Sequence, residues 1–233
     1  MESLPAYVSI VFILTTLAAV AFLLRIIKAA GEKTFPYNVL IFLLPTWLIF
    51  TGIVSIGGFY QITDSFPPRL MLFGILPAIL VGVFYFVFFR KNFIDRMPLK
   101  LLTLLHIVRI PVELVLLWLF FGGAVPQVMT FEGWNYDILS GVLALIVGFL
   151  AFRNKRVNRP LLIAFNLIGL ILLVNIVAIA LLSLPTPVQR LGFDQPNIAI
   201  LYFPYIWLPT VVVPIVFFSH LASIWKLIGR RDR

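Results

Sequence analysis

The sequence predicts an all-α membrane protein, a polytopic seven-helix transmembrane bundle in a single domain that covers residues 1–233. Three observations support this prediction. Hydrophobic residues form 62% of the chain and charged residues only 12%, whereas soluble domains are roughly 45–50% apolar and about 25% charged. Seven apolar stretches come close to or exceed the about 20 residues that a spanning helix needs. Lysine and arginine gather after every second stretch, as they do in cytoplasmic loops.

The seven predicted spans differ in length and in proline content. The fifth is short, so we expect it to begin within the preceding loop or to lie where the bilayer is thinned. The seventh contains Pro204, Pro209 and Pro214, which predict a kink or a tilt. The apolar runs are too continuous for the alternating pattern of barrel strands. The spans cover approximately residues 5–27, 38–60, 70–89, 99–121, 137–152, 159–184 and 198–226.

The basic residues predict the orientation of the chain. Only Arg69 and Arg190 lie on one side of the membrane, and Arg109 lies inside the fourth span. Because basic residues concentrate in cytoplasmic loops, the other side is predicted to be the cytoplasm, with the N-terminus outside and the C-terminus inside. The residues on that side are Arg25, Lys28, Lys33, Arg90, Lys91, Arg96, Lys100, Arg153, Lys155, Arg156, Arg159, Lys226, Arg230, Arg231 and Arg233.

The net charge of +9 does not indicate a nucleic-acid-binding protein, because the basic residues are spread over four short edges and form no single stripe. We expect them to attract anionic lipid headgroups. The lack of cysteine excludes a disulfide scaffold, thiolate nucleophiles and iron–sulfur sites. No phosphate loop, zinc pair or nucleophile elbow occurs in the sequence, so we predict no cofactor and no metal. The small size of the chain leaves a homodimer open.

The fourth span, LLHIVRIPVELVLL, is the most polar. It contains His106, Arg109 and Glu113, and this spacing places all three on one face of a helix. An ionisable residue within a span is unfavourable by about 2.5–3.5 kcal/mol on insertion scales, so the face is expected to point into the bundle or a wet cavity. Arg109 and Glu113 are four residues apart and are expected to pair.

Two other spans offer polar partners for this face. Asn166 and Asn175 lie in the sixth span and His220 in the seventh. Counting from the cytoplasmic edges places His106, Asn166 and His220 at a similar depth, about 9–11 Å into the membrane. If the helices are neighbours, these residues form a polar column that serves as a binding site or a path for a proton or solute. The alternative is structural: the Arg109–Glu113 pair and the asparagines hold helices together.

A haem or metal held by the two histidines is a weaker alternative. Histidine is a common ligand, but His106 and His220 have neither cysteine nor a carboxylate cluster beside them in the sequence.

Two loops on the predicted outer side carry carboxylates and aromatic residues. Glu132, Asn135 and Asp137 follow the fourth span, and Asp194 precedes the seventh. We predict that they form an external mouth, and the acidic character of the first loop favours a cationic or neutral ligand over an anion. The alternative is that the aromatic residues form an interfacial belt and Asp137 is the N-cap of the fifth span.

Three stretches, HIVRIPVELVL, VPQVMTFEGWNYDIL and FDQPNIAILYFPYIWLP, resemble a family of uncharacterised bacterial integral membrane proteins. The resemblance extends from His106 to His220. It implies a location in the bacterial inner membrane and transfers no activity and no catalytic residue.

The leading functional interpretation is binding or transport of a small solute or proton through a polar intramembrane cavity among the fourth, sixth and seventh spans. Glu113 would be the switchable carboxylate, Arg109 would hold its charge, and His106 would relay a proton. The alternatives are a membrane-embedded enzyme acting on a lipid-soluble substrate, with Glu113 as general acid or base and His106 as its partner, and a structural or accessory subunit. Whether the chain is an enzyme stays open.

Overall fold

The computed structural model describes residues 4–153 and 157–229, which form helices and no strand. Six helical segments are long and apolar enough to cross a membrane: Ala6–Gly31, Phe35–Ile56, Met71–Phe89, Leu99–Phe121, Arg159–Leu182 and Leu208–Gly229. A seventh apolar helix is shorter. The α-helices are α1 (Ala6–Gly31), α2 (Phe35–Ile56), α3 (Leu76–Phe89), α4 (Leu99–Leu105), α5 (Arg109–Phe121), α6 (Ile138–Leu150), α7 (Arg159–Leu182) and α8 (Val213–Gly229).

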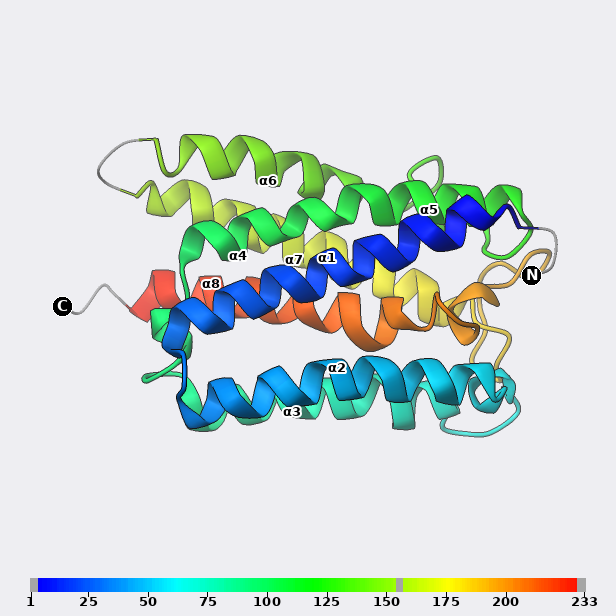
Figure 1. The fold of residues 1–233 in the computed structure, drawn as a ribbon. Coiled ribbons are helices and arrows are strands. Elements are labelled where there is room, and N and C mark those ends of the chain that lie inside the picture. Colours follow the sequence, from blue (N-terminus) through cyan, green and yellow to red (C-terminus); the bar gives the residue numbers. More distant parts are fainter. Residues whose placement is uncertain (1–3, 154–156, 230–233) are drawn as a thin grey trace.

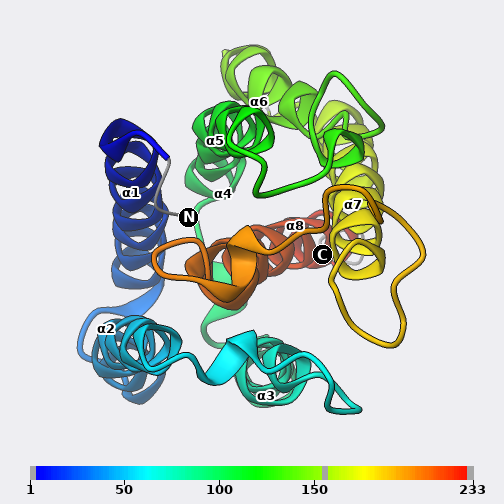
Figure 2. The ribbon, with the colours of Figure 1, turned by 90° about the vertical axis from the view of Figure 1, so that its right-hand side faces the viewer.

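The long helices run side by side along one axis, as expected for a bundle that crosses a bilayer (Figure 1). Seen from one end, α8 lies at the centre, with α1, α4–α5, α7 and α3 arranged around it (Figure 2). Burial follows this arrangement. In the span that contains α8, 56% of the residues in the most apolar stretch are buried. In the span that contains α3, only 11% of the corresponding residues are buried. The core of the bundle therefore surrounds α8, and α3 lies at its edge.

Besides the span that contains α3, which begins with the π turn η2 (Met71–Ile75), two further spans are interrupted by non-α turns. The fourth span consists of α4, the short turn η4 (His106–Val108) and α5, with Pro111 in the first turn of α5. The span that contains α8 begins with the π turn η7 (Leu208–Val212), which includes Pro209. Proline removes a backbone donor and disturbs the regular helix, which accounts for both breaks.

The predicted seventh span is too long at its start. Residues 198–207 contain only the short turn η6 (Ala199–Leu201) and further turns before the helix begins at Leu208. Pro204 lies in this stretch, and its fixed geometry and missing N–H disfavour a continuous helix there.

The helix of the fifth predicted span is too short to cross a membrane on its own. This helix, α6, has 13 residues and is therefore about 20 Å long, shorter than the roughly 30 Å hydrocarbon core. In Figure 1, α6 lies along one half of the bundle only. The other half of this layer is filled by residues 122–137, which we call the re-entrant segment. Its centre is inside the protein: Val125 and Thr130 are fully buried.

Hydrogen bonds from residues 195–199, which follow α7, hold the start of the re-entrant segment in place. The carbonyl of Ala124 accepts from the backbone N–H groups of Ile198 and Ala199 at 3.1 and 3.0 Å. The Gln195 side chain donates to the carbonyl of Val125 at 2.6 Å. Non-helical backbone at membrane depth is tolerated only where its polar groups are satisfied inside the protein, and these bonds meet that condition.

Small residues allow α6 to pack closely against the fourth span. Ser140, Ala144 and Gly148 recur every four residues and are buried, which is the small-residue pattern of close helix pairs in membranes. A Cβ atom on Gly141 would lie 2.6 Å from the Ile110 side chain. A larger residue at this position would push α6 away from α5.

The helix ends that precede or follow the basic clusters lie together at one end of the bundle, on the left in Figure 1. This arrangement agrees with the alternation of basic residues, but which end faces the cytoplasm stays a prediction. Part of the orientation signal, Lys155, Arg156, Arg230, Arg231 and Arg233, lies outside the described residues.

Candidate functional site

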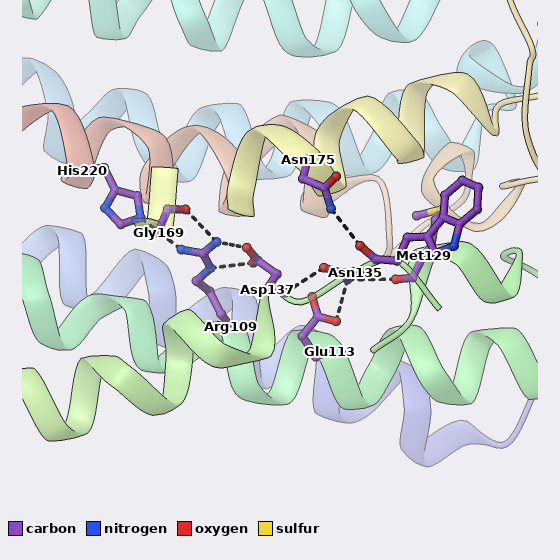
Figure 3. Close-up of polar contacts among 9 residues, drawn as sticks. Arg109, Glu113, Met129, Asn135, Asp137, Gly169, Asn175 and His220 are labelled. Carbon is purple, nitrogen blue, oxygen red and sulfur yellow. Dashed lines mark hydrogen bonds and ion pairs between the residues drawn. The ribbon is translucent and has the colours of Figure 1, made fainter. Parts of the chain in front are cut away.

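Arg109 is the centre of a buried polar network (Figure 3). Its side chain is almost fully buried, and its Nε donates to Asp137 Oδ2 at 2.5 Å. Its Nη2 forms an ion pair with the other oxygen of Asp137 and donates to the carbonyl of Gly169 at 3.1 Å. The expected partner was Glu113, but within residues 4–153 and 157–229 these two side chains form no ion pair. The expectation of an Arg109–Glu113 pair is therefore wrong, because Asp137 reaches the guanidinium from another element.

The third contact of Arg109 determines which ring nitrogen of His220 carries the proton. Arg109 Nη1 lies 3.0 Å from His220 Nε2. Because a guanidinium can only donate, Nε2 accepts this bond and the proton of the neutral imidazole lies on Nδ1. Nδ1 then donates to Asn166 Oδ1 at 3.0 Å. Asn166 in turn donates from Nδ2 to the carbonyl of Leu162 at 2.7 Å, so every polar atom of the His220 side chain is satisfied.

The two histidines are stacked on each other. The rings of His106 and His220 lie 3.8 Å apart with an angle of 20° between their planes, and Phe165 packs against the edge of His106. This contact leaves no room for a haem between the rings. Neither nitrogen of His106 has a hydrogen-bond partner among the residues that the structure describes. His106 therefore does not contact Glu113, and the expected relay between them is not formed in this conformation.

Glu113 is held by the re-entrant segment. Asn135 Nδ2 donates to Glu113 Oε2 at 2.6 Å and to the carbonyl of Met129 at 2.9 Å, while Asn135 Oδ1 accepts from the backbone N–H of Asp137 at 3.0 Å. The other carboxylate oxygen, Oε1, accepts no hydrogen bond from any residue in the described part of the chain. Glu113 itself is only 1% exposed. A buried carboxylate with one neutral donor is poorly compensated.

The network lies near the middle of the bundle. Arg109 stands close to the centre of the span Leu99–Phe121, about 15 Å from its first residue and about 18 Å from its last. Asp137 immediately precedes α6 and is held at the same depth by its pairing with Arg109. The short length of α6 follows from this pairing, because the helix begins beside Arg109, halfway along the bundle.

A cavity of about 220 Å³ adjoins the network. Arg109, Glu113 and Asp137 border it on one side, and all of its other walls are apolar. The expected polar cavity is therefore mainly hydrophobic, with its charge confined to one end. His106, Asn166, Asn175 and His220 do not line it. The apolar lining comes from α3, α5, α7, α8 and the turns beside them, and includes Ile79, Leu116, Leu173, Val177 and Phe217.

The predicted external mouth divides into two groups. Glu132 and Asp194 are exposed, as an external position requires. Asn135 and Asp137 are 0% and 5% exposed and belong to the intramembrane network. Placing all four in one external mouth was wrong because the re-entrant segment turns back into the bundle. Asn175 is half-buried and donates from Nδ2 to the carbonyl of Trp134 at 2.8 Å. It therefore anchors the re-entrant segment, and within the described residues it forms no hydrogen bond with Arg109.

One residue of the network was missed by sequence reasoning. Gly169 supplies a carbonyl to Arg109 and also leaves space for His220: a Cβ atom there would lie 2.5 Å from His220 Cε1. The available signal was a single glycine between long runs of leucine and isoleucine in the sixth predicted span. Small residues in membrane helices mark places of close approach.

Comparisons with known proteins give one match. No curated protein and no solved structure matches the chain. Residues 67–228, more than half of the chain, match a family described as a domain of unknown function, DUF8737, and the chain belongs to this family.

Proposed function

We propose that this multi-pass membrane protein binds a small solute in the cavity beside Glu113 and provides a path for a proton across the membrane. The observation that supports this most directly is the free oxygen of Glu113, Oε1, on a buried carboxylate at the edge of the cavity. Such an oxygen can accept a proton or a donor group of a ligand in turn. Intramembrane carboxylates commonly mark ion and proton paths.

The broken helices support transport over static binding. Discontinuous helices that meet near the middle of the membrane are typical of secondary transporters. Here α6 begins and η4 interrupts its span beside Arg109, and the π turn η7 begins its span at the wall of the cavity. The re-entrant segment, which covers the outer half of the bundle, is linked to Glu113 through Asn135. Protonation of the carboxylate or binding of a ligand to it would therefore alter the hydrogen bond that holds this segment.

The proposed topology has seven spans, with α6 and the re-entrant segment together forming the fifth. We place the N-terminus outside and the C-terminus in the cytoplasm of a bacterial cell, with anionic lipid headgroups at the basic end of the bundle. The support is the alternation of basic residues along the sequence and the resemblance described above. A homodimer stays open within this proposal.

Proton movement in reconstituted vesicles tests the function. Vesicles containing the protein and the trapped pH dye pyranine are given a membrane potential with valinomycin and K⁺. We expect faster proton entry than in protein-free vesicles, loss of this excess in Glu113→Gln, and no change in Glu132→Gln, which removes an exposed carboxylate. Native mass spectrometry of the same samples should detect a small retained mass in the wild type and in Glu132→Gln, and its loss in Glu113→Gln. Proton entry equal to that of protein-free vesicles, together with no retained mass, would exclude the proposal.

A structural or accessory role is the second candidate, because Arg109 has its nitrogens engaged by Asp137, Gly169 and His220. In that case the network would only hold α5, α6, α7 and α8 together. Loss of stability without loss of proton movement in variants of Glu113 would favour this candidate.

A further inference from the structure

We infer that the ligand of this cavity is a lipid-soluble amine that enters sideways from the bilayer, between α3 and α7. The inference rests on the proposed function, since it names the ligand class and the entrance of the same site. Its support comes from three features of the cavity: where its walls reach the surface, which charge is missing at its polar end, and how large it is.

The cavity reaches the outer surface of the bundle at α3 and α7. Ile79 on α3 and Val174 on α7 both line it, yet they are 42% and 56% exposed. Both residues lie within spanning segments, so the surface they expose faces hydrocarbon and not water. α3 is also the least buried span of the bundle. A ligand dissolved in the bilayer can therefore reach the cavity without passing through an aqueous mouth.

The charges at the polar end favour a cation. Arg109 contributes one positive charge, and Asp137 and Glu113 contribute two negative charges when ionised. His220 is neutral, because its Nε2 accepts from Arg109. When Glu113 is ionised the group therefore lacks one positive charge, and the open acceptor is Glu113 Oε1. An ammonium group offers both the charge and the N–H donors that this oxygen needs. An anion would find Arg109 already paired.

The size and lining of the cavity indicate how large and how apolar the rest of the ligand is. An apolar cavity of about 150 Å³ is large enough to hold benzene, so a volume of about 220 Å³ suits a six-carbon chain or a benzyl group with one polar head. Apart from the three charged residues the lining is hydrophobic. A polar solute such as a sugar would leave its hydroxyl groups without partners on these walls.

A matched set of probes tests the head group. Hexylamine, hexanol and hexanoate share one apolar tail and differ in charge at neutral pH. Each competes with a diazirine-bearing hexylamine for photolabelling of the protein in nanodiscs, and labelled peptides are identified by mass spectrometry. We expect labelling of the cavity-lining stretches of α3 and α7, competition by hexylamine about tenfold better than by hexanol, and none by hexanoate.

The variant Glu113→Gln should remove the preference for the amine over the alcohol and retain labelling of the cavity. Glutamine keeps an oxygen that accepts from Asn135, so the fold is expected to survive, and a thermal unfolding measurement verifies this. Glu132→Gln is the matched control and should behave like the wild type. Equal competition by the three probes, or stronger competition by hexanoate, would overturn the amine assignment while leaving a bound ligand and proton movement intact.

Tryptophan substitutions test the entrance. Ile79→Trp and Val174→Trp should each reduce labelling inside the cavity at least fivefold, because the ring would fill the gap between α3 and α7. The controls are Leu80→Trp and Ile171→Trp, which lie on the same helices, are 56% and 68% exposed, and do not line the cavity. Undiminished labelling in the first pair would overturn lateral entry. If no labelling of the cavity occurs in the folded wild type, the whole inference fails, and the proton assay decides the proposed function separately.

Discussion

Arg109 forms its ion pair with Asp137, which lies 28 residues further along the chain, and not with Glu113, which follows one helical turn after it on the same helix. This choice of partner has two consequences. It anchors the first turn of α6 in the middle of the bundle, and it leaves Glu113 with a single hydrogen bond from Asn135. The pair that stabilises the fold and the carboxylate that is open to a ligand are thus different residues.

The first prediction concerns the pair itself. Arg109→Leu should lower the free energy of unfolding by about 3–5 kcal/mol, because it leaves Asp137 buried without a partner. The double variant Arg109→Leu/Asp137→Leu should recover most of this loss, since neither charge is then left buried alone. Unfolding in detergent, followed by far-UV circular dichroism, measures both. Recovery by Arg109→Leu/Glu113→Leu in place of the Asp137 double variant would show that Glu113 is the true partner.

The sequence predicted the membrane class and the helical bundle because these depend on hydropathy alone. It also predicted that His106, Asn166 and His220 lie at a similar depth, since the rise of a helix fixes that depth, whereas it left open whether their helices are neighbours. His220 hydrogen-bonds Asn166 and stacks on His106. Six long apolar helices and one shorter one are found, and the shortness of the fifth span was already visible in the sequence.

The partner of Arg109 could not be predicted in the same way. Spacing within one helix favours Glu113, whereas Asp137 is close only because the re-entrant segment turns back into the bundle. That turn depends on side-chain-to-backbone hydrogen bonds, such as those from Asn135 and Gln195. Single polar residues of this kind leave no periodic pattern in the sequence, so the segment looks like an ordinary external loop.

A second prediction concerns Gly169. In Gly169→Ala the new Cβ would lie 2.5 Å from His220 Cε1 and 2.8 Å from its Nε2, so the ring must move and lose its bond to Arg109. We expect a loss of about 1–3 kcal/mol in the free energy of unfolding. Gly82→Ala is the matched control, because its new Cβ would lie 3.9 Å from the Phe218 ring, and it should be close to neutral. Equal effects of the two variants would contradict the tight packing of α7 on α8.

A third prediction concerns orientation, and it uses the absence of cysteine from the chain. Glu132→Cys and Asp194→Cys place thiols at exposed positions on the predicted outer side, and Glu32→Cys places one at an exposed position on the other side. A membrane-impermeant maleimide added to intact bacteria that express the protein should label the first two only. After permeabilisation all three should react. Labelling of Glu32→Cys alone in intact cells would reverse the predicted orientation.

The last prediction concerns the link between Glu113 and the re-entrant segment. Asn135→Ala removes the bonds to Glu113 and to the carbonyl of Met129, and the acceptor for the backbone N–H of Asp137. The segment is then expected to leave the bundle more often, because its backbone groups at membrane depth lose their partners. A cysteine introduced as Met129→Cys, at a position that is 1% exposed, reports this opening.

The impermeant maleimide should react with Met129→Cys about tenfold faster when Asn135→Ala is also present, since the loss of roughly 1–2 kcal/mol of hydrogen bonding raises the open population by that order. Gln127→Cys, which lies at an exposed position of the same segment, should react equally fast in both backgrounds and controls for reagent access. If Met129→Cys reacts at the same low rate with and without Asn135, the segment is held by its other contacts, namely those of Ala124 and Val125 with residues 195–199 and that of Trp134 with Asn175. Glu113 would then have no means of controlling access from that side.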